Sequence, residues 1–311
     1  MIERTNLRIN LIFTVWFLAV AVIPSALVAY FSFVFERNQV EAAAQRQLAV
    51  ASRLKSDRLS GHVIDTLVRL RDIEHRFALQ QGGTAGLFSL LDLLEEDNAV
   101  PLYFVENGSV VYPEGAPEGV GLSWLGELPK DLPHARLVSG ALVIAYPWPG
   151  EQQWLVSVQS RDRVDALLYS DINDKRFLSR SGLAGAPDDI GRTADVVVFD
   201  SDAYALSRSL MIETVSDASS LSPALAAWIL GSRDSVLSVR TVLRDGREVL
   251  LHARRATLLD HEITLVLTQD TAETMSGLYE NLRGAFLTYI FILIFVLIFL
   301  YIFVRNVSSI V

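Results

Sequence analysis

The chain has 311 residues, of which 51% are apolar, and it carries a formal net charge of −9 and no cysteine. The lack of cysteine excludes a disulfide scaffold, a thiolate metal site, an iron–sulfur cluster and a cysteine nucleophile. The acidic balance argues against nucleic acid as a partner, because a surface that binds nucleic acid is basic. The mean hydropathy of +0.32 is high for a chain with 20% charged residues, which indicates that the apolar residues are gathered in blocks.

Two of these blocks predict membrane spans. Residues 9–35 and residues 284–304 contain no Asp, Glu, Lys or Arg, and each run is long enough for the ~20 residues that a helix needs to cross a bilayer. The first run exceeds the about 7–15 apolar residues of a cleaved signal peptide. Arg4 and Arg8 precede the first run and Arg305 follows the second, so the positive-inside rule places both termini in the cytoplasm and the long loop outside.

The loop begins with a pattern typical of one long helix, in residues 36–83. Apolar residues recur at steps of three and four, proline is missing, and Gly61 is the one glycine before the pair Gly82 and Gly83, which we expect to end the helix. Such a helix would span roughly 70 Å. It predicts a stalk or spine along the domain that follows.

Strand patterns follow the long helix in a first series. A short helix is expected at 85–94, then strands at 101–105 and 109–112 joined by Asn107-Gly108, a strong hairpin signal. Turns fill 113–133, and the series closes with two strands and a helix, at 141–146, 154–159 and 163–180.

A second series follows a linker rich in Gly and Pro at 182–191 and has a similar order. The expected elements are a hairpin of 195–199 and 203–207, a helix at 221–230, strands at 236–243, 249–258 and 262–268, and a helix from residue 271 into the second apolar run. The stretch from Leu102 is similar in form to the stretch from Val196, and the stretch from Trp154 to the stretch from Ile263. The order and spacing of the elements indicate a duplication more strongly than the residue identities do.

This architecture resembles the double Cache (tandem PAS-like) sensor region of bacterial transmembrane receptors. The resemblance covers the whole chain and implies an α+β fold of two PAS-like units with antiparallel sheets, a long N-terminal helix and two framing spans. The segments expected on this basis are a cytoplasmic start (1–10), the first span (11–35), the long helix (36–83), a membrane-distal unit (84–181), a membrane-proximal unit (182–270), a signalling helix with the second span (271–304), and the start of a cytoplasmic linker (305–311).

No motif for catalysis or for a cofactor is found. The five histidines form no ligand pair at metal-site spacing, no Gly-rich phosphate loop follows a strand, and no Gly-x-Ser-x-Gly elbow occurs. The turn Asp200-Ser201-Asp202 lacks the pattern of a calcium loop. We therefore expect no catalytic residue, no metal and no cofactor, and a chain that is not an enzyme.

A ligand pocket is the site that the resemblance implies, in the membrane-distal unit. Aromatic side chains with polar ends suit such a pocket, and an arginine can hold a carboxylate in a bidentate way. The candidates are Tyr103, Arg136, Tyr146, Trp148 and Trp154. The alternative interpretation is core packing of Tyr103 and Trp154, with Trp148 covering a loop. The second unit offers Tyr204, Trp228, Arg240 and Arg254 with weaker reason. The arginine–tryptophan–tyrosine pattern of amino-acid-binding double Cache sensors is not found, so an amino acid is not implied.

The function predicted is that of a receptor in the bacterial inner membrane that senses an extracytoplasmic small molecule. We expect the lipid bilayer and a second copy of the chain, in a homodimer, as its partners. A cytoplasmic output domain, a histidine kinase before other types, is expected to follow residue 311. The alternatives are a two-span assembly protein, such as a regulator of polysaccharide chain length, and a partner-binding subunit without a ligand. The second span lacks the proline and glycine that are common in the chain-length regulators.

Overall fold

The computed structural model describes residues 2–80, 86–89, 91, 101–113, 115, 117, 120–150, 152–169, 194–207 and 215–308. The chain divides into two compact units. The helical unit comprises Met1–Ala44 and Ala272–Val311, and the sheet unit comprises Gln45–Thr271. The predicted helix end at Gly82 and Gly83 and the predicted linker at 182–191 lie outside the described residues.

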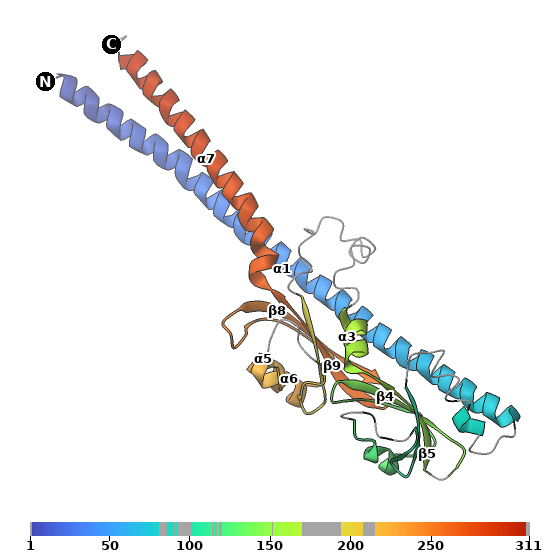
Figure 1. The fold of residues 1–311 in the computed structure, drawn as a ribbon. Helices are drawn as coiled ribbons and strands as arrows, with labels where there is room; N and C mark the ends of the chain where they lie inside the picture. The colour runs from blue at the N-terminus through green and yellow to red at the C-terminus, as the bar shows by residue number, and fades with distance from the viewer. Residues whose placement is uncertain are drawn as a thin grey trace. The chain divides into compact units, whose positions relative to one another are not determined.

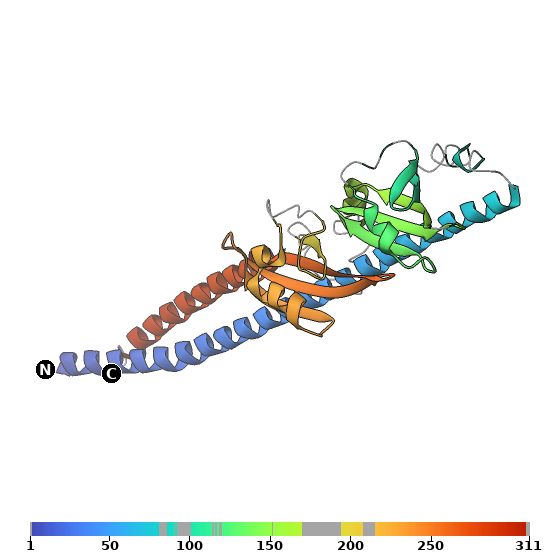
Figure 2. The same ribbon diagram turned by 90° about the horizontal axis from the view of Figure 1, so that it is seen from below.

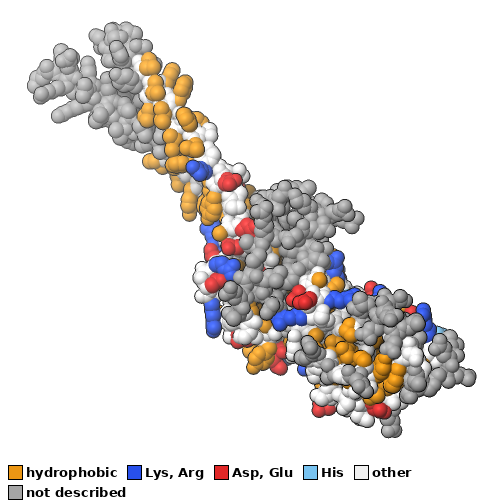
Figure 3. Space-filling view, in the orientation of Figure 1, with side chains coloured by type: hydrophobic (Ala, Val, Ile, Leu, Met, Phe, Trp, Pro, Cys, Tyr) orange, Lys and Arg blue, Asp and Glu red, His pale blue; other side chains and the backbone are white. Residues whose placement is uncertain are grey.

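The helical unit is built from the start of α1 (Ile2–Gln80) and from α7 (Thr271–Ser308). The two helices lie beside each other, with the N- and C-termini of the chain at the same end (Figures 1 and 2). Hydrophobic side chains cover the surface of the described part of these helices, whereas charged side chains gather over the sheet unit (Figure 3). Within the described part of the chain, one helical stretch is long and apolar enough to cross a membrane, Thr271–Phe299.

Both long helices are continuous. The first apolar run and the predicted stalk belong to the single helix α1, which continues through Pro24 even though proline removes one backbone hydrogen bond. The prediction of an unbroken helix from residue 271 to residue 304 is confirmed by α7, which begins at Thr271 directly after the last strand ends at Asp270.

In the sheet unit, α1 buries one stripe of side chains, as its periodicity predicts. The apolar members of this stripe are fully or almost fully buried: Leu48, Leu59, Val63, Leu70 and Ile73. Charged residues such as Arg53 and Asp57 occupy the exposed face and form an i,i+4 ion pair. The buried stripe fixes which face of α1 is turned to the rest of the unit.

Sheet A has the strand order β2-β1-β5-β4-β3, antiparallel throughout. Its strands are β1 (Leu102–Glu106), β2 (Ser109–Tyr112), β3 (His134–Val138), β4 (Ala141–Pro147) and β5 (Gln153–Gln159). The predicted Asn107-Gly108 hairpin is confirmed, with positive φ at both residues as a tight hairpin turn requires. A Cβ on Gly108 would lie 2.9 Å from the carbonyl oxygen of Ser123, so no other residue fits there.

The sequence pattern predicts turns over 113–133 and no strand between 113 and 140, so β3 (His134–Val138) is not predicted. The turn that joins β3 to β4 is Ser139-Gly140, and both residues have positive φ. Pairing with β4 supplies the hydrogen bonds that a short segment beside Pro133 cannot make alone. The helix predicted at 163–180 is described as α3 (Arg161–Tyr169), and its predicted second half lies outside the described residues.

Sheet B has the strand order β6-β9-β8-β7. Its strands are β6 (Asp195–Phe199), β7 (Val236–Val242), β8 (Glu248–Leu258) and β9 (His261–Asp270). An isolated bridge joins Phe199 to Ala205, which places the segment after β6 at the edge that β2 occupies in sheet A. The two sheets therefore share one order of elements, and they lie one after the other along α1 (Figure 2).

The predicted hairpin of 195–199 with 203–207 is wrong in extent. The side chain of Asp200 accepts hydrogen bonds from the backbone N–H groups of Asp202 and Tyr204, which holds a local turn in place of a ladder. The helix predicted at 221–230 is confirmed as α6 (Pro223–Gly231), and a further short helix, α5 (Ala218–Leu221), precedes it and meets it at an extended Ser222. Pro223 disfavours helical backbone at the residue before it.

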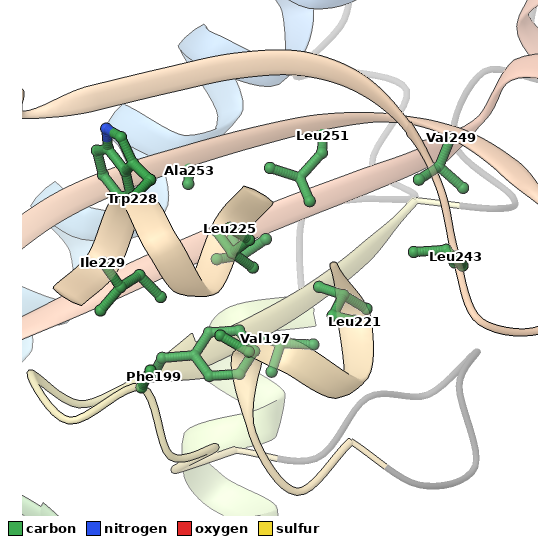
Figure 4. Close-up of a cluster of buried hydrophobic side chains, with 13 residues drawn as sticks. Val197, Phe199, Leu221, Leu225, Trp228, Ile229, Leu243, Val249, Leu251 and Ala253 are labelled. Atoms are coloured by element: carbon green, nitrogen blue, oxygen red, sulfur yellow. The ribbon is translucent and has the colours of Figure 1, made fainter. Parts of the chain in front are cut away.

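Sheet B carries a hydrophobic core on the face covered by α5 and α6 (Figure 4). Phe199, Leu225 and Leu251 are among its fully buried members, and Trp228 is nearly so. Sheet A has its own core, on the face covered by the 3-10 helix η1 (Ser123–Glu127), which buries Leu125. Each sheet thus has an independent apolar layer.

Candidate ligand-binding site

The two faces of sheet A contact different parts of the chain. We call the face that packs against η1 the loop face, and the face that hydrogen-bonds to α1 the helix face. Side chains alternate between the faces along each strand. On the loop face, Val143, Ala145 and Val156 pack with the residues around η1. On the helix face, Tyr146 and Gln159 hydrogen-bond to side chains of α1. The face of each predicted site residue therefore decides which of them can meet.

Three of the predicted residues, Tyr103, Arg136 and Trp154, lie on the loop face. Trp154 is 1% exposed within the core, and its ring meets the imidazole of His134 edge to face, with centroids 5.5 Å apart. Arg136 lies at the surface with its guanidinium carbon 5.6 Å from the ring centre of Trp124. Core packing accounts for Tyr103 and Trp154, and stacking on Trp124 accounts for Arg136.

The other two, Tyr146 and Trp148, lie on the opposite side. Tyr146 donates a hydrogen bond to Glu74 of α1, and Trp148 packs against the rings of Phe77 and Phe104, with centroids 5.3 and 5.9 Å away. The five predicted residues therefore do not share one face of sheet A, and a role in ligand binding stays a prediction for each of them. Tyr146 is separated from the loop face because it follows Ala145 by one position, and one position reverses the face.

The weaker candidates of the second unit do not gather either. Tyr204 is 63% exposed and Trp228 belongs to the core of sheet B. The guanidinium of Arg240 makes a bidentate ion pair with Glu248 on the neighbouring strand. Within the described ranges, no three His, Asp or Glu side chains form a group that could hold a metal ion.

A cavity of about 370 Å³ lies on the helix face, between α1, β1, β5 and α3. None of the predicted residues lines it. It is lined by His62, Asp65, Thr66, Arg69, Leu70 and Ile73 of α1, by Leu102, Ser157 and Gln159 of the sheet, and by Arg163 and Leu167 of α3. Its volume lies in the range of small-molecule sites.

Hydrogen bonds at the cavity wall connect the sheet to α1. His62 Nε2 and Gln159 Oε1 are 2.5 Å apart, and Gln159 Nε2 donates to Thr66 Oγ1 over 3.3 Å. The Thr66 hydroxyl donates back to the carbonyl oxygen of His62. Because the oxygen of Gln159 is an acceptor, Nε2 of His62 carries the proton. These bonds tie β5 to one turn of α1 at the cavity wall.

Ser157 gives the floor of the cavity an unsatisfied polar atom. Its residue is fully buried, and its Oγ has no hydrogen-bond partner among the described residues. A buried hydroxyl without a partner is unfavourable by about 1–3 kcal/mol, and Ser157 is one of the residues at the cavity wall. Ser157 and Gln159 alternate with Val156 and Val158 in β5, and this alternation of polar and apolar residues is the sequence signal for a polar group on the helix face.

The charged side chains that line the cavity have a net positive charge. Arg69 and Arg163 line it together with one carboxylate, Asp65, while Leu70, Ile73, Leu102 and Leu167 form apolar wall. Guanidinium groups bind carboxylates with two parallel hydrogen bonds. The combination fits a small molecule with one anionic end and an apolar body.

Comparison with known proteins identifies structures but no sequence family. No family model and no curated protein matches the chain. Its structure is similar to an extracellular ligand-binding receptor from Desulfohalobium retbaense, at 12% identity and a TM-score of 0.46, over 71% of this chain and 40% of that one. It is also similar to the sensory domain of the Campylobacter jejuni chemoreceptor Tlp3, solved with isoleucine bound, at 12% identity and a TM-score of 0.47, over 77% of this chain and 98% of that one.

A third similar structure is the periplasmic sensory domain of the Campylobacter jejuni chemoreceptor Tlp1. The identity is 8% and the TM-score 0.49, over 76% of this chain and 98% of that one. These three structures are an extracellular ligand-binding receptor and the sensory domains of two chemoreceptors.

Proposed function

We propose that this chain is the sensory part of a bacterial transmembrane receptor, and that it binds a small organic carboxylate in the cavity between α1, β5 and α3. The observation that carries the proposal is the buried, unpartnered hydroxyl of Ser157 in a cavity that also presents Arg69 and Arg163. A carboxylate would meet the guanidinium groups, and a second polar atom of the ligand would meet Ser157. The leucines and Ile73 would cover the apolar body of the ligand.

The signal would leave the cavity through α1. His62 and Thr66, which bond to Gln159 of the sheet, belong to the same helix as the first apolar run. A ligand that competes for these hydrogen bonds favours a different position of α1 against β5, and a packed helix responds by a small discrete shift. A helix without a break carries such a shift along its axis.

We also propose how the sensor is anchored and what it is connected to. The two sheets are the two units of a double Cache region, α1 and α7 cross the inner membrane, and the sheet unit lies outside the cytoplasm. The receptor acts as a homodimer, and a cytoplasmic output domain, of histidine kinase type, receives the signal. The shared order of elements in the two sheets and the apolar surfaces of both helices support this proposal.

A thiol at the cavity floor tests the proposed site. The natural chain has no cysteine, so Ser157→Cys would introduce a single reactive group of nearly the same size. In the full chain in lipid nanodiscs, we expect a small methanethiosulfonate to modify Ser157→Cys. The matched control is Ala145→Cys, a fully buried position on the loop face of the same sheet, which should not react. Equal inertness of both variants would contradict an accessible cavity.

Protection of this thiol tests the ligand class. Acetate, butyrate and benzoate are compared with acetamide, butyramide and benzamide, which have the same shape without the charge. We expect at least one carboxylate to slow the modification of Ser157→Cys, and its amide to have no effect. Adding Arg163→Gln should abolish the protection, whereas Arg247→Gln, in the distant β7–β8 turn, should leave it intact. Equal protection by acids and amides would argue against recognition of a carboxylate.

A further inference from the structure

The two sheets of the sheet unit are joined by a buried histidine and a carboxylate. His134 begins β3 of sheet A and is 3% exposed, and Asp260 lies in the turn between β8 and β9 of sheet B. His134 Nδ1 and Asp260 Oδ2 are 2.5 Å apart. Strands β3 and β9 are in contact at this point. A polar bond thus connects the sheet that carries the cavity to the strand that precedes α7.

Both ring nitrogens of His134 face hydrogen-bond acceptors. The second nitrogen, Nε2, lies 2.9 Å from the carbonyl oxygen of Pro129, and a carbonyl oxygen accepts but never donates. An ionised carboxylate likewise only accepts. The two bonds are satisfied together when both nitrogens carry a proton, and that is the imidazolium form. When the ring loses one proton, one buried nitrogen presents its own lone pair to an acceptor, and that hydrogen bond is lost.

The carboxylate is held in place from its own side as well. Asp260 Oδ1 lies 3.4 Å from the backbone nitrogen of Ala135, so both oxygens reach β3. The turn that presents Asp260 is short, because Leu258 pairs with His261. Leu259 within it has a φ of 56°, a left-handed conformation that is strained for leucine and persists where its surroundings hold it.

Other charged groups surround this pair. Arg136 follows on the same strand, and His261 follows Asp260. Burial lowers the pKa of His261, and the charge of Arg136 lowers it further, while Asp260 and Asp200 act in the opposite direction. Arg136, Asp200 and Asp260 therefore act on His261 beside the bond between His134 and Asp260.

We propose that His134 and Asp260 form a protonation-dependent clasp that makes sheet A and sheet B move as one body. With His134 doubly protonated, the clasp is closed, and a displacement of sheet A reaches β9 and the start of α7, which follows it without a loop. With His134 neutral, one bond is lost and the sheets reorient independently. The contacts of His134 and Asp260 support the clasp, and its part in signalling rests on the proposed receptor function.

Spin-label distances measure the clasp directly. In the full, otherwise cysteine-free chain in nanodiscs, labels at Ser109→Cys in β2 and Arg233→Cys before β7, both exposed positions, report the distance between the sheets. Histidine ¹⁵N spectra between pH 5 and 9 follow the ring protons of His134. We expect a narrow distance distribution while both nitrogens are protonated, and a broad one once the ring is neutral, with the same midpoint in both measurements.

Variants separate the clasp from a general effect of pH. Asp260→Ala removes both carboxylate oxygens from an exposed turn residue, so it should give the broad distribution at every pH. His75→Gln changes an exposed histidine of α1 and should behave as the unmodified chain does. A narrow distribution that persists while His134 loses a ring proton, or in Asp260→Ala, would overturn the proposal. Because neither readout needs a ligand, failure of the carboxylate experiment leaves this test unaffected.

Discussion

Tyr146 of β4 donates a hydrogen bond to Glu74 of α1, with 2.9 Å between the hydroxyl and carboxylate oxygens. The residues are 72 positions apart in sequence. Together with the bonds of Gln159 to His62 and Thr66, this contact ties the helix face of sheet A to α1 at separate turns of the helix. Polar groups that a ligand or a change of charge can affect therefore help to hold α1 against the sheet, together with its buried apolar stripe.

Removing this bond should cost stability in a pH-dependent way. Burial raises the pKa of Tyr146, and the hydrogen bond to Glu74 raises it further. A group whose pKa is higher in the folded state contributes its full stability below the unfolded value of about 10, and this contribution is lost as the pH rises through the folded value. Tyr146→Phe should lower the free energy of unfolding by about 1 kcal/mol at pH 7, since the pair is partly exposed to solvent.

Urea unfolding of the full chain in detergent, at pH 7 and pH 11, measures this effect. The difference between the unmodified chain and Tyr146→Phe should shrink at the higher pH. Tyr204→Phe serves as the control, because Tyr204 is 63% exposed, and it should leave stability unchanged at pH 7. A difference that stays constant with pH would show that Glu74 does not hold the hydroxyl.

His252 should make the sheet unit less stable in mild acid. It is buried in β8, with Ser238 Oγ 2.7 Å from its Nδ1. Burial lowers the pKa of His252, and the nearby Arg254 lowers it further. Above about pH 6.5 the ring is neutral in both the folded and unfolded states; below this, the unfolded chain binds the proton more readily, so stability falls as the pH drops.

The measurement is the free energy of unfolding from pH 8 to pH 5. His252→Gln should reduce the loss of stability between pH 6.5 and pH 5, because the substituted side chain does not titrate. His75→Gln, at an exposed position of α1, provides the matched comparison and should keep the slope of the unmodified chain. Identical slopes for all three proteins would refute the assignment to His252.

Arg255 should contribute to stability through geometry as well as charge. Its Nη2 lies 2.8 Å from the carbonyl oxygens of both Ile229 and Ser232 at the end of α6, and its Nη1 lies 2.8 Å from Glu262. The guanidinium also stacks over Trp228, 5.1 Å from the ring centre. A lysine keeps the charge and cannot reproduce this planar set of bonds.

Arg255→Lys should therefore lower the free energy of unfolding by about 1–3 kcal/mol, measured by urea unfolding at pH 7. Arg247→Lys tests the same exchange at an exposed turn, where Arg247 pairs with Asp245, and the expected change is within about 0.5 kcal/mol. If the two exchanges cost the same, the bonds of Arg255 to α6 add nothing beyond its charge.

Single cysteines should establish the proposed topology. In intact cells, a membrane-impermeant maleimide should label Ser201→Cys, an exposed turn position of the sheet unit. It should not label Thr5→Cys or Ser309→Cys until the membrane is permeabilised, because the proposal places both termini in the cytoplasm. Labelling of either terminal position in intact cells would contradict two spans with both ends inside.

Local chemistry explains the elements that could be read from the sequence. The Asn107-Gly108 hairpin follows from residues that accept positive φ, and the helix from residue 271 follows from an apolar run without a breaker. Strand β3 could not be predicted from the sequence, because its five residues are stabilised by pairing with β4 rather than by their own pattern. The hairpin after β6 was overpredicted because the side chain of Asp200 competes with the ladder for backbone N–H groups.

By itself the sequence determined the two apolar blocks, the exclusion of cysteine chemistry, the long helices and most strands, because each depends on neighbours within a few residues. Only the tertiary structure decided where a site can be. Tyr146 and Trp154 belong to one sheet yet face opposite sides, and the cavity is made by Ser157 and Gln159 with a helix whose nearest lining residues lie about ninety positions earlier. Such contacts depend on which face of each strand meets α1, and one residue of register reverses that face. The bond between His134 and Asp260, 126 positions apart, exists for the same reason: two sheets with separate cores are brought together by packing, which no local pattern encodes.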